Sequence, residues 1–110
     1  MRNFISIKNN RDFMFMYRRA RSLCADCLVM YVRKNKTGDL KLGITVTKKV
    51  GKAVVRNRIR RRIKEVFSEL SEGIPPCYDI IVVARSKAAF VRYGELKSAM
   101  KYLLAKAELI

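Results

Sequence analysis

The sequence predicts an α+β fold, a small two-layer sandwich with the element order α-β-β-β-α-β-α. Two kinds of pattern lead to this prediction: some stretches repeat apolar residues with helical spacing, and others alternate or run continuously apolar, as strands do. The 110 residues suffice for one modest core. No linker, internal repeat or low-complexity segment divides them, so we expect a single domain over residues 1–110.

The first expected element is a helix over residues 11–19, capped by Asn10. Phe13 and Tyr17 lie one turn apart on one of its faces, with Met16 beside them. These side chains are therefore expected to turn toward a sheet.

Three strands are expected next. Residues 23–27 are short and suit a sheet edge, whereas residues 28–33 alternate as a half-buried strand does. Residues 35–39 contain a glycine and indicate a hairpin loop. The run at residues 40–47, which has the clearest period of two, is therefore expected to return beside the preceding strand.

The second half contains a basic helix, a buried strand and a last helix. The basic helix is expected to begin near residues 53–55, after Gly51, and to end at residues 71–76, which contain a proline pair. Residues 78–84 are continuously apolar, which is typical of a strand covered on both faces. The last helix, at residues 93–106, is expected to close the core through Leu96, Met100, Leu103 and Leu104.

The charge of the chain points to a polyanionic partner. There are 25 Lys and Arg against 9 Asp and Glu, which gives +16. Such a field favours a polyanion and causes self-repulsion when no partner is bound. Nucleic acid is the commonest counter-charge. An anionic membrane surface is the alternative, but no apolar run is long enough to span or anchor, so we expect no membrane partner.

The N-terminus and the cysteines indicate a cytoplasmic protein. The first ten residues carry charge where a secretory signal needs a continuous apolar core. The chain has an odd number of cysteines, Cys24, Cys27 and Cys77, which the cytosol would keep reduced. A structural zinc site needs four ligands, and the chain has no His to complete one, so we expect no metal site.

The basic helix divides into faces at about 100° per residue. One side carries the apolar stripe of Val55, Ile59, Ile63, Val66 and Leu70, with Phe67 at its edge. The opposite side carries Asn57, Arg60, Arg61 and Lys64, and a flank carries Arg58 and Arg62 together with Glu65 and Glu69. The stripe is expected to be core.

Two interpretations stay open for the charged faces of this helix. A flank with Glu65 and Glu69 suits either salt bridges to Arg61 and Arg62 or contact with a ligand. No carboxylate interrupts the outer face, and uncompensated like charges one turn apart destabilise a helix unless an anion covers them. Arg also suits bidentate phosphate contacts, so we expect this face to bind nucleic acid.

Lys48, Lys49 and Lys52 precede the basic helix, so phosphates bound there could also meet its free N–H groups. A Walker motif is excluded, because Val46 and Ala53 stand where the motif needs Gly and Ser or Thr.

A second candidate surface is aromatic. Phe13 and Tyr17 on the first helix and Tyr31 on a strand are expected to meet over the sheet. If the helix covers the sheet only partly, the result is a cleft in which single-stranded bases stack on the rings. Plain core packing is the alternative.

The side chains offer binding rather than catalysis. The chain lacks His, the usual general base of metal-independent ribonucleases. Its nine carboxylates are scattered without the close pair that a two-metal site needs. We therefore expect no catalytic residue, and a stand-alone nuclease is disfavoured.

The chain resembles the protein subunit of bacterial ribonuclease P. The similarity is strongest over residues 48–67, which contain the lysine pair, the glycine and the Arg56-Asn57-Arg58 signature. It continues through Asp12-Phe13 with Tyr17 one turn later, through Tyr31, and through residues 78–85. Tyr17 stands where the family often has Phe.

The resemblance implies the fold, the partners and the activity. The fold would be ribosomal protein S5 domain 2-like, with a left-handed βαβ crossover, an exception to the usual right-handed rule. The chain would join a catalytic RNA, in a 1:1 complex, to form an endonuclease that removes the 5′ leader of precursor tRNA. The cofactor would be Mg²⁺, bound mainly by the RNA subunit and the substrate.

The resemblance also assigns residues to two sites. The RNA-contacting candidates are Lys48, Lys49, Lys52, Arg56, Asn57, Arg58, Arg60, Arg61 and Lys64. The candidates for the 5′-leader cleft are Phe13, Tyr17 and Tyr31. The alternative function is that of a ribosomal or general RNA-binding protein without a role in cleavage.

Overall fold

The computed structural model describes residues 4–110 and has the predicted α+β class, with one five-stranded sheet and three α-helices. The elements in chain order are β1 (Ile5–Ser6), α1 (Asn10–Arg19), β2 (Arg21–Cys24), β3 (Leu28–Lys34), β4 (Lys41–Thr45), α2 (Ala53–Leu70), η1 (Ser71–Gly73), β5 (Tyr78–Ala84), η2 (Ser86–Ala89) and α3 (Tyr93–Lys106). The predicted basic helix, buried strand and last helix are confirmed. The two-residue strand β1 was not predicted, because it is too short to show a period.

The sheet has the order β1-β4-β5-β3-β2. β4 runs parallel to β5, whereas β3 runs antiparallel to it. The predicted hairpin between residues 28–33 and 40–47 is therefore wrong, since β5 lies between these strands. β5 is the most apolar strand. It occupies the centre of the sheet, where it is buried on both faces.

α2 connects the parallel neighbours β4 and β5, so the three elements form a βαβ unit. The left-handed sense of this crossover stays a prediction from the resemblance.

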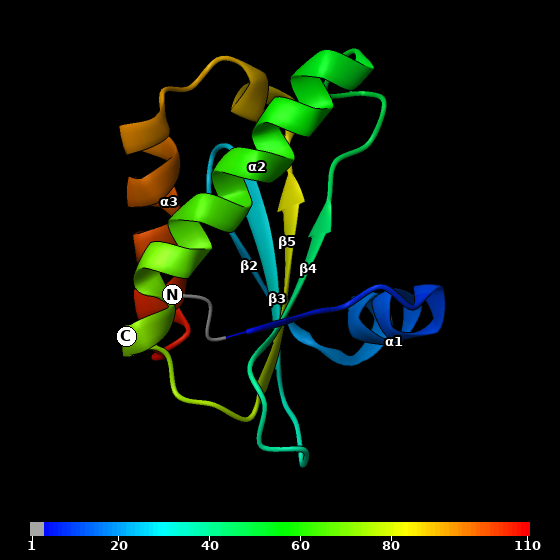
Figure 1. The fold of residues 1–110 in the computed structure, drawn as a ribbon, viewed down its shortest axis with the longest axis vertical. Coiled ribbons are helices and arrows are strands. Elements are labelled where there is room, and N and C mark those ends of the chain that lie inside the picture. Colours follow the sequence, from blue (N-terminus) through cyan, green and yellow to red (C-terminus); the bar gives the residue numbers. More distant parts are fainter. Residues whose placement is uncertain (1–3) are drawn as a thin grey trace.

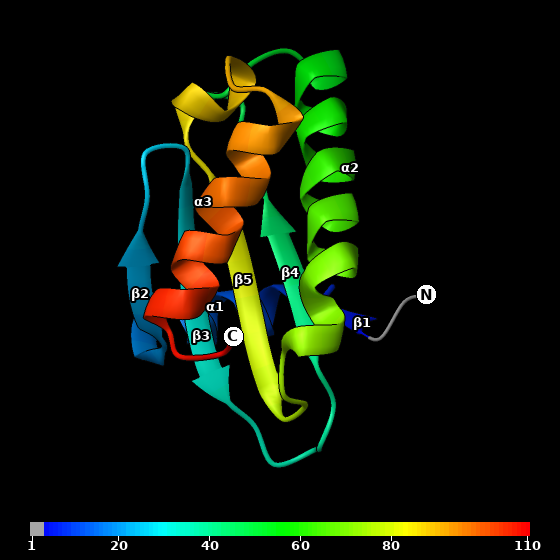
Figure 2. The ribbon, with the colours of Figure 1, turned by 90° about the vertical axis from the view of Figure 1, so that its left-hand side faces the viewer.

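The main core lies between the sheet and the pair α2–α3, which covers one of its faces (Figures 1 and 2). Leu28, Met30 and Val32 of β3 turn this way and are buried. α2 contributes Ile59, Ile63, Val66 and Phe67, and α3 contributes the predicted Leu96, Met100, Leu103 and Leu104. Val55 and Leu70, the ends of the predicted stripe, are half-buried.

α1 crosses the opposite face of the sheet (Figures 1 and 2). Met16 is its one buried residue. Several sheet residues on this face stay half-buried, among them Tyr31, Thr45 and Val83. α1 therefore covers this face only in part.

Two predicted boundaries are corrected. α1 is capped by Asn9 and not by Asn10: the Asn9 backbone is extended, and its side chain accepts a hydrogen bond of 2.9 Å from the Arg11 N–H. The edge strand β2 begins and ends earlier than residues 23–27, since residues 25–27 form the turn into β3. Within residues 4–110, no helix is both long enough and apolar enough to span a bilayer.

Candidate nucleic-acid interface

The basic surface consists of the nine residues predicted to contact RNA, on α2 and on the loop at residues 46–52 that leads into it. Seven of them are exposed: Lys48, Lys49, Lys52, Asn57, Arg60, Arg61 and Lys64. The loop is fixed by Val46 and Val50, which are buried in the core. The lysines are thus held at the surface by their apolar neighbours.

The N-terminus of α2 is open to an anion. Lys52, its N-cap residue, forms no side-chain capping hydrogen bond, and the first turn contains no acidic residue. The first N–H groups of a helix lack partners within the helix and carry a partial positive charge. An anion at this end would meet both these groups and the neighbouring lysines.

Arg56 and Arg58 differ from the other members of the basic surface, because both are half-buried. The Arg56 Nε donates a 3.1 Å hydrogen bond to the Gly51 carbonyl, which ties the first turn of α2 to the loop. The Arg58 Nε is buried and has no hydrogen-bond partner within residues 4–110. Arg56 therefore contributes to the shape of the surface as well as to its charge.

The salt bridges considered for the flank of α2 are not formed. Glu69 instead bonds to α3: its Oε2 lies 2.9 Å from the Lys97 Nζ, and its Oε1 accepts a 2.9 Å hydrogen bond from the Tyr93 hydroxyl. These two hydrogen bonds lower the pKa of Glu69. Burial and the bond to Glu69 raise the pKa of Tyr93 to about 12.

The cations of α2 consequently lack compensation by carboxylates. The ion pairs within residues 4–110 are Arg33–Asp79, Lys87–Asp26 and Lys97–Glu69, and none of them includes a cation of α2. This arrangement favours an anionic ligand over a face neutralised by its own helix.

The aromatic surface consists of Phe13, Tyr17 and Tyr31, which the structure brings together as predicted. The ring centroids of Phe13 and Tyr17 lie 6.3 Å apart, and those of Tyr17 and Tyr31 lie 5.1 Å apart in an edge-on arrangement. All three residues are half-buried. They therefore pack on one another and still expose part of each side chain.

Two sheet residues position these rings. The Tyr17 hydroxyl and the Thr45 hydroxyl form a 2.6 Å hydrogen bond. Gly43 lets Phe13 approach β4 closely, because a Cβ at this position would lie only 2.8 Å from the Phe13 Cζ. Thr45 also ends β4, so the aromatic surface lies beside the start of the loop that carries the lysines.

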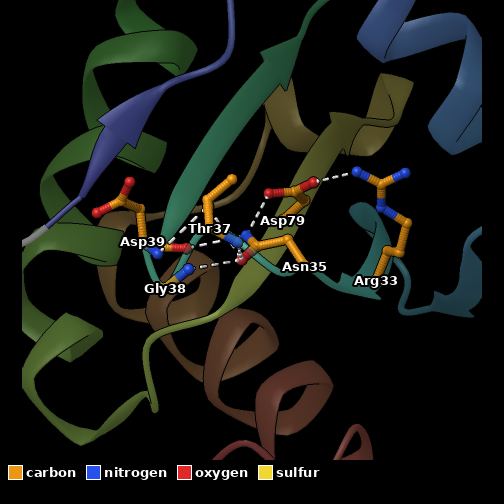
Figure 3. Close-up of polar contacts among 6 residues, drawn as sticks. All are labelled: Arg33, Asn35, Thr37, Gly38, Asp39 and Asp79. Atoms are coloured by element: carbon orange, nitrogen blue, oxygen red, sulfur yellow. Dashed lines mark hydrogen bonds and ion pairs between the residues drawn. The ribbon is translucent and has the colours of Figure 1, made fainter.

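A polar network lies at the other end of the sheet (Figure 3). The Arg33 Nη2 donates a 2.6 Å hydrogen bond to the buried Asp79, and the Asn35 Nδ2 donates one of 2.7 Å to the other Asp79 oxygen. The Asn35 Oδ1 accepts hydrogen bonds from Thr37 and Gly38. The network fixes the loop between β3 and β4 to β5.

Arg33 has a second contact in the same region. Its guanidinium carbon lies 4.5 Å from the centroid of the Phe15 ring, on the flank of α1 away from the aromatic surface. Sequence reasoning missed Phe15, Arg33, Gly43 and Thr45. Of these four, only Gly43 could have been found from the sequence. A glycine within an alternating strand often marks a place where another group approaches the backbone closely.

No group of three or more His, Cys, Asp or Glu that could hold a metal ion gathers within residues 4–110. Cys24 is exposed, Cys27 is buried and Cys77 is half-buried, and all three are free thiols. Burial raises the pKa of Cys27, which favours the neutral thiol over the thiolate that metals bind.

Comparisons with known proteins match nearly the whole chain. The family model described as Ribonuclease P matches residues 1–108. The ribonuclease P protein component of Clostridium botulinum is 40% identical over 102 residues, which cover 92% of each chain. The Staphylococcus aureus RNase P protein structure has a TM-score of 0.88 at 35% identity, covering 94% of this chain and 95% of that one. The RNase P protein from Thermotoga maritima has a TM-score of 0.83 at 30% identity, covering 92% and 96%.

Proposed function

The chain belongs to the ribonuclease P protein family, whose members are the protein part of an RNA–protein endoribonuclease, and on this premise we propose how its surfaces serve the enzyme. Its partner is the ribonuclease P RNA. The basic surface binds that RNA, and the aromatic surface holds the single-stranded 5′ leader of precursor tRNA. The holoenzyme then removes the leader and leaves the mature 5′ end.

The uncompensated charge of α2 is the observation that supports the RNA contact. Arg60, Arg61 and Lys64 are exposed, and no carboxylate within residues 4–110 pairs with them. Closely spaced cations repel one another until a polyanion covers them. A structured RNA offers phosphates along its whole length and satisfies several of these side chains together.

Stacking supports the assignment of the leader to the aromatic surface. Unpaired bases expose their faces and stack on aromatic side chains, whereas the bases of a duplex stack on one another. The rings of Phe13, Tyr17 and Tyr31 are partly exposed and held in place by Thr45 and Gly43. These side chains are already ordered before the leader binds, so binding costs less conformational entropy.

The chemistry of cleavage is assigned to the RNA subunit. This chain offers no cluster of ligands for a metal ion within residues 4–110, so Mg²⁺ is assigned mainly to the RNA and the substrate. The protein contributes by binding and positioning both RNAs, in a 1:1 complex with the RNA subunit. We place this complex in the cytoplasm, where precursor tRNA is made.

Reconstitution tests this proposal against the alternative of an RNA-binding protein without a role in cleavage. The chain is mixed with ribonuclease P RNA at low Mg²⁺, and 5′ cleavage of a precursor tRNA is measured with each component alone and with both. We expect cleavage by the RNA to increase strongly when the protein is added, and no cleavage by the protein alone.

Two outcomes would contradict the proposal. RNA binding without stimulation of cleavage would favour the general RNA-binding protein. Cleavage by the protein alone would place the chemistry in this chain. A variant with Arg60, Arg61 and Lys64 changed to Ala serves as the control, because it keeps the buried face of α2 and removes exposed cations.

A further inference from the structure

The solvent-exposed side of α1 combines apolar and basic residues. We call it the outer face of α1; it consists of Arg11, Met14, Phe15, Arg18 and Arg19, which line a hollow of about 360 Å³. Met14 and Phe15 are 45% and 44% exposed. Phe13, Met16 and Tyr17 form the main contact of the helix with the sheet, and Phe15 adds only its contact with Arg33 of β3.

The charge of this face is also uncompensated. Asp12 is the one carboxylate of α1, against three arginines within the helix, Arg11, Arg18 and Arg19, all of which line the outer face. No ion pair within residues 4–110 includes any of them. The face therefore attracts an anion and repels a basic partner such as a second copy of this +16 chain.

The Phe15 ring is fixed in position although it is exposed. Arg33 lies against it at 4.5 Å, and Arg33 is in turn held by its 2.6 Å ion pair with the buried Asp79. Asp79 also accepts the hydrogen bond from Asn35 that fixes the neighbouring loop. The ring is thus supported from one side and remains accessible on the side of the hollow.

We propose that the outer face of α1 binds unpaired nucleotides of single-stranded RNA, with a base stacked on Phe15 and phosphates contacted by Arg11, Arg18 or Arg19. This inference rests on the proposed function. The RNA is the part of the 5′ leader that lies beyond the nucleotides on the aromatic surface. An α-helix with its side chains is about 10–12 Å across, so a strand that rounds α1 reaches Phe15 within a few nucleotides.

The combination of groups selects single-stranded RNA. An exposed ring flanked by arginines gives stacking and backbone neutralisation together, as in sites that bind single strands without sequence preference. A duplex would contact the arginines but could offer no base to Phe15. The substrate therefore gains affinity here only if its leader is long enough and unpaired.

The test measures the Kd of the assembled holoenzyme for precursor tRNAs whose unpaired leaders are extended one nucleotide at a time. For the unaltered protein we expect affinity to rise in two stages, as the leader reaches the aromatic surface and then the outer face. Phe15→Ala should remove the second stage, a loss of roughly tenfold, and leave the first unchanged. Arg18→Ala should lower the salt dependence for long leaders by about 0.7 in logarithmic slope per lost phosphate contact.

Matched variants separate stacking from folding. Phe15→Tyr keeps a ring and should keep the second stage, whereas Phe15→Leu keeps apolar volume and should lose it. Phe90→Ala removes a ring that is 85% exposed on the far side of the molecule, beside η2, and should change neither stage. Urea unfolding of each variant shows whether any loss arises from the fold.

The outcomes are distinct. A first stage with no second stage, or a second stage that Phe15→Ala leaves intact, overturns this inference and leaves the proposed function standing. The absence of both stages contradicts the proposed function itself. Self-association of the free protein that depends on Phe15, with no effect of leader length, overturns the inference and assigns the face to a protein contact.

Discussion

Tyr17 makes two kinds of contact: its ring packs against Phe13 and Tyr31, and its hydroxyl forms a hydrogen bond with the Thr45 hydroxyl. Tyr17→Phe removes the 2.6 Å hydrogen bond and keeps the ring. We expect the free energy of unfolding to fall by about 1 kcal/mol, since a half-buried hydroxyl pair is lost. Affinity for precursor tRNA should stay within about twofold, because stacking on the ring is retained.

Urea unfolding and Kd measurements on the same preparation check this prediction. Tyr17→Ala is the companion variant, which removes both contacts and should weaken both quantities. If Tyr17→Phe loses leader affinity while its stability is unchanged, the hydroxyl contacts the RNA and does not serve the fold.

For single residues, the sequence predicts which aromatic rings meet but not which sheet residues fix their positions. Helical spacing and strand alternation suffice to bring Phe13, Tyr17 and Tyr31 to one surface. The partners Gly43 and Thr45 depend on how α1 crosses the sheet, an angle that no local pattern contains. The contact of Phe15 with Arg33 depends on the same angle and was missed for the same reason.

The helix α2 shows how tertiary partners override local pairing. Glu69 lies at a spacing that suits intrahelical salt bridges, yet Lys97 and Tyr93 of α3 bind it. An exposed pair along a helix contributes only about 0.3–0.5 kcal/mol, so a contact to a neighbouring helix easily competes with it. Glu69 is therefore not available to neutralise a cation of its own helix, and no cation of α2 forms an ion pair within residues 4–110.

The two surfaces should be separable by mutation, because α1 and α2 lie on opposite faces of the sheet. Arg61→Ala should weaken binding of the ribonuclease P RNA and lower the logarithmic salt slope by about one unit. Tyr31→Ala should weaken binding of precursor tRNA relative to mature tRNA by roughly tenfold. Filter binding with both tRNAs and with the RNA subunit measures these effects.

Lys36→Ala is the control for loss of charge, since Lys36 is exposed in the loop between β3 and β4, outside both surfaces. It should have little effect on either binding reaction. Equal losses for precursor and mature tRNA in Tyr31→Ala would argue against a leader site on the aromatic surface.

The contact between α2 and α3 should depend on pH through Glu69. Its pKa is lowered from an ordinary value of 4.5 by hydrogen bonds from Lys97 and Tyr93. A carboxyl with a lowered pKa stabilises the fold above its ordinary pKa, and this contribution is lost as the pH falls through the lowered value. Glu69→Gln should therefore be less stable than the unaltered protein at neutral pH, and the difference should vanish in acid.

Urea unfolding at a series of pH values measures this difference. Glu65→Gln removes the same charge from α2 at a position that forms no hydrogen bond or ion pair with α3 within residues 4–110, so a general effect of charge appears in both variants. A difference for Glu69→Gln that persists unchanged in strong acid would show that the bonds to Glu69 do not depend on its charge.

On the scale of the whole molecule, the central position of β5 explains why the fold class was predictable and the strand pairing was not. Periodicity predicts nearly every helix and strand, and the apolar run of residues 78–84 predicts a strand covered on both faces. Pairing was predicted from nearness in the chain, which favours a hairpin between β3 and β4. A continuously apolar strand is typical of the centre of a sheet, where both faces are covered and both edges are paired, and the strands that pair with β5 are β3 and β4.

The net charge of +16 predicts opposite effects of salt on folding and on RNA binding. Cations within the basic surface and on α1 repel one another in the free protein, so added sodium chloride should screen this repulsion and raise the free energy of unfolding. The same salt should weaken binding of the ribonuclease P RNA, because releasing counterions into a more concentrated salt solution gains less entropy. If the six exposed cations of the basic surface contact phosphates, affinity should fall about a thousandfold between roughly 50 and 200 mM salt.

Urea unfolding of the free protein and Kd measurements over one salt series test both the expected rise in stability and the expected loss of RNA affinity. Salts with different anions at equal ionic strength should give equal stabilisation if screening is the cause. A free protein that salt destabilises would mean that its cations are already compensated within the fold, which would remove the physical basis for expecting a polyanionic partner.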